Sequence, residues 1–187
     1  LHHDFRSDPD DVGELRIYVD TQRMISVRRH PLKTSDRLRR EMRRGQEVGS
    51  PIALFERFIE LLAETFGEVV TRLTDEVDDA EDRVLGGRYL DQGTELGRMR
   101  RLMVRLRRFI AADRVALVQL AARLPAVFGT EERQRLREAI DALDLVAGDL
   151  ELVQDRARLL QEEIAGRVGE ATNRKRSCHG RSQTAPS

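Results

Sequence analysis

The longest regular pattern in the chain is an amphipathic repeat between Glu131 and Arg174. Positions seven residues apart are apolar, and a second apolar line runs beside them, as on one face of an α-helix. The first line consists of Leu136, Leu143, Leu150, Ala157, Ile164 and Ala171, and the second of Ile140, Val146, Val153, Leu160 and Val168. At about 1.5 Å per residue this helix spans roughly 65 Å, which predicts a stalk rather than a core helix.

The apolar pattern near the start of the chain has period two instead. The apolar residues that alternate with polar ones over residues 14–29 are Leu15, Ile17, Val19, Ile25 and Val27. With a short polar connection at residues 20–23, this alternation predicts a β-hairpin. A two-stranded hairpin is marginal in water, so we expect further strands from sequence before Leu1.

Three more helices are predicted between the hairpin and the stalk. The first covers 36–44, with Ser35 as its N-cap and five arginines in its sequence. The second covers 51–85, because Ser50 is followed by proline at the first helical position. The third covers 94–124 and ends at a proline. The fold class is therefore α+β, predominantly helical.

Opposite charges predict that the second and third helices pair antiparallel. The end of the second helix is acidic and the start of the third is basic, so a turn at 86–93 brings the two clusters together. The acids are Asp75, Glu76, Asp78, Asp79, Glu81 and Asp82. The arginines are Arg98, Arg100, Arg101, Arg105, Arg107 and Arg108. We expect Asp78 and Asp82 to lie near Arg98–Arg105.

Composition narrows the possible functions. Lys plus Arg and Asp plus Glu both number 33, so net charge gives no reason to expect a nucleic-acid partner. Cys178 is the only cysteine, which excludes an internal disulfide and a multi-cysteine zinc site. No apolar run reaches the length of a membrane helix. Phosphate-binding loops, HExxH and Gly-x-Ser-x-Gly are absent, so we expect a protein that is not an enzyme.

The order of these parts resembles the cytoplasmic part of CorA-type divalent metal-ion transporters. The amino-acid sequence is most similar to the ZntB zinc-transporter branch. The resemblance covers roughly residues 10–174. The stretches that carry it are SPIALFERFIELLAETFGEVVTRLTDEVDDAEDRVL, LRRFIAADRVALVQLA and LREAIDALDLVAGDLELVQDRARLLQEEIAGRVGEATNR, after the hairpin LRIYVDTQRMISVRR.

The resemblance implies four parts. Residues 1–49 are the end of a cytoplasmic αβ domain, of which the β-hairpin is a remnant. Residues 50–125 are an antiparallel helix pair, 126–175 the stalk helix and 176–187 a disordered tail. The family's membrane helices and its Gly-Met-Asn pore loop are absent. We therefore expect a truncated, soluble, cytoplasmic piece that does not conduct ions alone, from a protein at the cytoplasmic face of the inner membrane.

The resemblance also implies a homo-oligomer, a pentamer, and a set of site residues. Glu138 and Asp141 match a region where the family holds a regulatory metal between subunits, and Asn173 falls at the cytoplasmic mouth of the pore. The expected ions are Zn²⁺ or Mg²⁺, and no tightly bound cofactor is expected. The membrane is reached only through a segment absent here. The simpler interpretation of Glu138 and Asp141 is solvated acids near a helix N-terminus, favourable to its dipole.

Two other functions remain open. A soluble, coiled-coil-like scaffold would use the apolar stripe of the long helix to bind partner helices. A weaker alternative is a nucleic-acid or anionic-lipid binder that acts through the arginines at 37–44 and 98–108.

Overall fold

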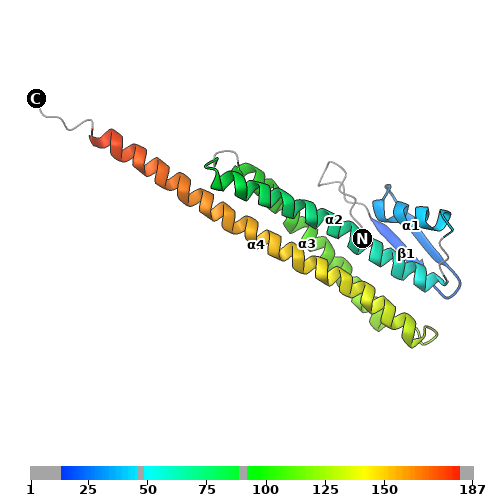
Figure 1. Ribbon diagram of the computed structural model, residues 1–187. Helices are drawn as coiled ribbons and strands as arrows, with labels where there is room; N and C mark the ends of the chain where they lie inside the picture. Colours follow the sequence, from blue (N-terminus) through cyan, green and yellow to red (C-terminus); the bar gives the residue numbers. More distant parts are fainter. Residues whose placement is uncertain (1–13, 46–48, 89–91, 182–187) are drawn as a thin grey trace, which may run out of the picture.

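A computed structural model describes residues 14–45, 49–88 and 92–181, with side chains up to residue 169 (Figure 1). It confirms a predominantly helical α+β fold. The elements in chain order are β1 (Leu15–Val19), β2 (Met24–Arg28), α1 (Lys33–Arg43), α2 (Pro51–Leu85), α3 (Gln92–Ala122) and α4 (Thr130–Arg181).

The hairpin forms where the period-two pattern predicts it. β1 and β2 are antiparallel, with Leu15 opposite Arg28 and Val19 opposite Met24. The Asp20 carboxylate stabilises the turn, because Oδ1 accepts hydrogen bonds from the backbone N–H groups of Gln22 and Arg23 at 2.8 and 2.9 Å. The further strands expected before Leu1 remain a prediction.

Helix α1 begins three residues before the predicted start. The Asp36 N–H donates to the Leu32 carbonyl at 3.0 Å, so the first turn closes ahead of Ser35. The prediction of Ser35 as N-cap is therefore wrong, and Leu32 holds that position without a side-chain cap. The Thr34 hydroxyl donates to the Thr65 hydroxyl at 3.1 Å, which ties α1 to α2 in a buried position.

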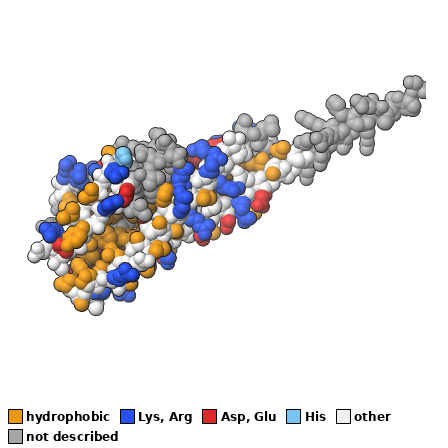
Figure 2. Space-filling model, turned by 180° about the vertical axis from the view of Figure 1, so that it is seen from behind, with side chains coloured by type: hydrophobic (Ala, Val, Ile, Leu, Met, Phe, Trp, Pro, Cys, Tyr) orange, Lys and Arg blue, Asp and Glu red, His pale blue; other side chains and the backbone are white. Residues whose placement is uncertain are grey.

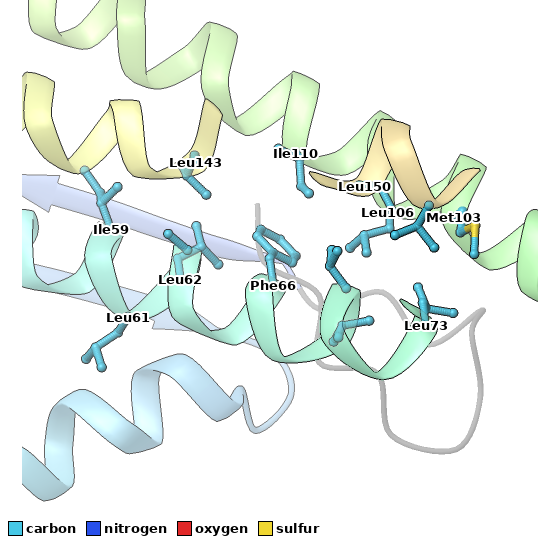
Figure 3. Packing of buried hydrophobic residues seen from close by; sticks show 14 of the residues in the cluster. Ile59, Leu61, Leu62, Phe66, Leu73, Met103, Leu106, Ile110, Leu143 and Leu150 are labelled. Carbon is cyan, nitrogen blue, oxygen red and sulfur yellow. The ribbon is translucent and has the colours of Figure 1, made fainter. Parts of the chain in front are cut away.

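Helix α2 has the predicted ends. The Ser50 Oγ accepts a hydrogen bond from the Ala53 N–H at 3.2 Å, and the chain turns after Leu85 through Gly87, whose φ is +82°. Leu61 points toward α1, whereas Leu62 and Phe66 point toward α3 and α4 (Figure 3). Helix α2 therefore joins the hairpin and α1 to the helical core.

Helix α4 is a core helix as well as a stalk. The predicted line from Leu136 to Ile164 is buried, and α4 packs along both α2 and α3. The α2–α3 pair is an antiparallel hairpin, but each of the two helices packs mainly against α4 and only sparingly against the other. The structure adds to the predicted stalk that residues 136–164 of this helix also pack in the core, because its apolar stripe is wide enough to cover two helices.

The C-terminal part of α4 projects past the α2–α3 turn (Figure 1). Among the side chains of this helix that the structure describes, Ile164 is the last buried one. The helical backbone continues to Arg181, seven residues past the predicted end at Arg174 and into the segment predicted to be disordered. No proline lies between Thr130 and Arg181, and arginine and lysine are good helix formers.

One ion pair, with a buried carboxylate and a partly exposed arginine, joins the start of α4 to α2. The Arg135 Nε lies 3.1 Å from the Glu56 Oε2, and Glu56 is only 5% exposed. Burial raises the pKa of Glu56, and the hydrogen bond from Arg135 opposes that shift. Arg133 of α4 donates to the carbonyls of Leu124 and Pro125, which precede the helix, at 2.8 and 2.7 Å.

Candidate functional site

A line of exposed leucines runs along the outward face of α4. Leu145, Leu152 and Leu159 are spaced by seven residues and are 72%, 67% and 58% exposed. Their neighbours Leu143 and Leu150 are fully buried on the opposite face. A single exposed leucine needs no explanation, but three at a heptad spacing form the seam by which helices associate. We call these three residues the leucine line.

The two predicted metal residues continue the leucine line toward the start of α4. Glu138 lies seven residues before Leu145, and Asp141 lies four before it. Both acids are exposed. They are three residues apart and therefore share one face of the helix. The Gln134 Nε2 donates a hydrogen bond to the Glu138 Oε1 at 3.0 Å.

Glu138 and Asp141 offer only part of a metal site. Mg²⁺ takes six oxygen ligands, some of them water, and Zn²⁺ takes four ligands in most protein sites. Across the described ranges, no three His, Cys, Asp or Glu side chains are grouped so that they could hold a metal ion. A metal at this pair would need water or a second chain for its remaining ligands.

The predicted pore-mouth residue also belongs to this register. Asn173 lies fourteen residues after Leu159, two heptads further along α4. Its backbone is helical, but its side chain lies outside those that the structure describes. The pore-mouth role of Asn173 remains a prediction.

The predicted charge pairing between α2 and α3 is seen at Arg98. Arg98 lies 3.3 Å from Glu76. We expected Asp78 to face the arginines of α3, but it pairs with Arg156 of α4 at 2.6 Å. Glu81 forms a second ion pair with Arg156 at 2.7 Å. The difference follows from the packing, because α4 lies closer to α2 than α3 does along most of its length.

The arginines of α3 line a groove beside α4. Arginine side chains gather along the middle of the face shown in Figure 2. The groove has a volume of about 450 Å³. Its main lining residues are Gly97, Arg100, Arg101, Arg105 and Arg108 of α3 and Gln161 of α4. We call it the arginine groove.

Sequence reasoning missed the leucine line although its signal is present. The three leucines repeat every seven residues outside both apolar lines that we assigned to the buried face. A helix with one buried face would carry polar residues at these positions. The repeat therefore marks a second apolar face on α4.

Comparison with known proteins assigns the family. A model of the family described as CorA-like Mg2+ transporter protein matches residues 1–175. The chain belongs to this family. Among curated relatives of this CorA-like chain, the divalent cation transporter CmaX of Pseudomonas aeruginosa is 27% identical over 169 residues, which are 90% of the chain and 51% of CmaX. The zinc transport protein ZntB of Photorhabdus laumondii is 24% identical over 167 residues, 89% of the chain and 51% of ZntB.

Solved structures agree with the family. Full-length CmaX superimposes with a TM-score of 0.85 at 26% identity, over 96% of this CorA-like chain and 56% of that structure. The CorA magnesium transporter of Methanocaldococcus jannaschii gives 0.74 at 14% identity, over 95% of the chain and 62% of that structure. The ZntB cytoplasmic domain of Vibrio parahaemolyticus gives 0.64 at 19% identity, over 79% and 57%. The last two comparisons show a shared fold.

The CorA-like chain spans about half the length of the curated relatives it matches. None of its described helices combines the length and apolar character that crossing a bilayer requires. The family is one of metal-ion transporters, which are not enzymes.

Proposed function

We propose that the chain is the regulatory and stalk portion of a CorA/ZntB-like transporter of divalent metal ions, at the cytoplasmic face of the membrane. In this proposal it assembles as a homo-oligomer, a pentamer by analogy with the family, through the leucine line of α4. Glu138 and Asp141 supply carboxylates to Zn²⁺ or Mg²⁺ between neighbouring copies. No nucleic acid and no tightly bound cofactor take part.

The observation that carries the proposal is the shared register on α4. The leucine line supplies an apolar seam, and the two acids lie at its N-terminal end on the same outward face. Helices that associate through the leucine line therefore bring acids from different copies near one another. Two or more carboxylates around a shared ion would complete the ligand set that one chain lacks, and the ion would offset their repulsion.

Metal-dependent assembly tests the proposal directly. Sedimentation velocity of the purified chain is expected to show more oligomer with Mg²⁺ or Zn²⁺ than with a chelator. In Glu138→Gln/Asp141→Asn, the metal concentration needed for half-maximal assembly should rise about tenfold or more, because the site loses its charged ligands. Asp149→Asn, which removes an exposed acid from the same helix, should leave the response intact. An unchanged response in the double variant would rule out this metal site.

In the same proposal, the chain contributes assembly and metal response rather than the conduction path. We expect no Zn²⁺ or Mg²⁺ flux above background when the purified chain is mixed with liposomes. Flux that depends on the chain would contradict this division of roles.

A soluble scaffold that binds partner helices is the second candidate, and the leucine line favours it too, because a partner helix could cover the same seam. The two candidates predict different oligomeric states for the purified protein. A scaffold would remain monomeric with and without metal and would bind amphipathic helical peptides through Leu145, Leu152 and Leu159. A transporter piece would associate with itself.

A further inference from the structure

Several arginines gather in the arginine groove. The described residues that line it include Arg100, Arg101, Arg105 and Arg108 and no aspartate or glutamate. The chain as a whole has equal numbers of basic and acidic residues. The gathering of arginines in the groove is therefore a local feature of the chain.

Other arginines of the same structure face carboxylates. Arg57 lies within 3.1 Å of Glu41, Glu60 and Glu64. On α3 itself, Arg98 pairs with Glu76 at 3.3 Å and Arg107 pairs with Glu151 at 2.8 Å. These two arginines flank the groove, so acids are within reach of α3 on either side of it.

The groove orients one of its arginines without cancelling its charge. The Arg100 Nη1 donates to the Gln161 Oε1 at 2.8 Å, and an amide oxygen is a neutral acceptor. The Arg108 guanidinium lies 5.5 Å from the centre of the Phe109 ring, which again leaves its charge in place. Arg101 and Arg108 are both exposed. Guanidinium N–H groups of these residues are therefore available on the groove side of α3.

A glycine leaves the floor of the groove open. A Cβ atom at Gly97 would lie 3.8 Å from the Arg101 Nη1 and 3.8 Å from the Gln161 Nε2. A larger side chain at this position would extend between these two groups. Glycine therefore gives a ligand direct access to the space between α3 and α4.

We propose that the arginine groove binds an oligophosphate, a small ligand that carries two or more linked phosphate groups. The planar guanidinium fork matches phosphate oxygens in a bidentate geometry. The volume of about 450 Å³ lies in the range of small-molecule sites. From Arg101 to Arg108 the helix rises about 10 Å, a span that flexible arginine side chains shorten to the length of a chain of linked phosphates. A single flat charged surface would suit a membrane better than this groove does.

Calorimetric titration of the full 187-residue chain with inorganic triphosphate tests the proposal. We expect saturable binding that weakens as salt concentration rises. Arg101→Gln/Arg108→Gln should weaken binding about tenfold or more, because two bidentate partners are lost. Arg98→Gln/Arg107→Gln removes the same charge from the same helix outside the groove and should change affinity no more than about twofold. Gly97→Leu should weaken binding while every charge is retained, and circular dichroism melting checks that each variant is folded.

Further titrations distinguish a soluble oligophosphate from a phosphorylated lipid headgroup. ATP presents a soluble triphosphate, and vesicles that contain a polyphosphoinositide present the same groups as a lipid headgroup. Whichever of the two binds to the wild type identifies the source, provided that its binding is lost in Arg101→Gln/Arg108→Gln and is competed by free triphosphate.

Three results would overturn the proposal. One is the absence of triphosphate binding at low salt. Another is equal loss in the groove variant and in its matched control, which would indicate general electrostatic attraction. The third is binding only to anionic vesicles that contain no polyphosphoinositide.

Discussion

At the scale of single residues, Ser50 and Ser35 make different contacts near the starts of neighbouring helices. Ser50 caps α2 by accepting a hydrogen bond from the Ala53 N–H. Ser35 lies inside α1, and its buried Oγ has no hydrogen-bond partner among the described residues. The position of each serine relative to the first helical turn decides whether its hydroxyl satisfies a free backbone N–H group.

Replacing each serine by alanine should give different changes in stability. Ser50→Ala is expected to lower the free energy of unfolding by about 1 kcal/mol, because an N-cap hydrogen bond is lost. Ser35→Ala should be neutral or slightly stabilising, since it removes a buried hydroxyl without a partner. Urea denaturation measures both. Equal losses in the two variants would contradict the assigned cap.

Asp113 is the other residue whose environment has a measurable consequence. It lies on the core side of α3 and is 4% exposed. Burial raises the pKa of Asp113 to about 6, because the charged form is poorly solvated there. A carboxyl group whose pKa is higher in the folded state than in the unfolded state stabilises the fold at low pH. That contribution is lost as the pH rises toward 6.

Asp113→Asn should therefore stabilise the protein in a pH-dependent manner. Asparagine resembles the protonated acid, so the variant and the wild type should have similar free energies of unfolding below about pH 4. Above pH 6 the variant should be more stable by about 2–3 kcal/mol. Urea denaturation from pH 4 to 8 measures the difference, with Asp149→Asn as a control for the lost charge. A constant difference across this range would contradict the assigned shift.

At the scale of elements, α4 presents two apolar faces with different roles. Leu150 is fully buried between helices, and Leu152, two residues later, is 67% exposed. We expect Leu150→Ala to lower the free energy of unfolding by roughly 2–5 kcal/mol, because it creates a cavity. Leu152→Ala should change it by no more than about 0.5 kcal/mol in the monomer. Thermal or urea unfolding at low protein concentration checks both, and a large loss in Leu152→Ala would place that leucine in the core.

The ends of the elements show what could be predicted from the sequence. The strong signals were local: Ser50 before Pro51 set the start of α2, and alternation set the hairpin. The start of α1 could not be predicted, because backbone bonding from Asp36 to Leu32 outweighed the cap preference of Ser35.

Features that depend on which helices meet were harder to predict. From the sequence, an arginine of either α3 or α4 could pair with Asp78. The packing of α4 against α2 determines that the partner is Arg156. The arginine groove depends on Gln161 lying beside α3, a contact between positions 61 residues apart. The candidate metal residues Glu138 and Asp141 were identified through family resemblance, and their ligand role remains a prediction.

At the scale of the whole molecule, one long helix connects all proposed parts of the function. Its buried face holds α2 and α3 together, and its outward face carries the two acids and the leucine line. Its C-terminal part projects beyond the bundle (Figure 1). In the proposed assembly, a change of metal occupancy near Glu138 would act on the seam that continues toward Asn173.

Self-association through the leucine line is the central claim, and sedimentation velocity over a range of protein concentrations tests it most directly. We predict that the wild type forms a defined oligomer and that Leu145→Ser/Leu152→Ser/Leu159→Ser is a folded monomer. Val115→Ser/Val118→Ser/Val127→Ser, which removes exposed apolar side chains elsewhere, should assemble like the wild type. A wild type that stays monomeric at every concentration, with and without Mg²⁺ or Zn²⁺, would contradict the claim, as would a leucine variant that assembles unchanged.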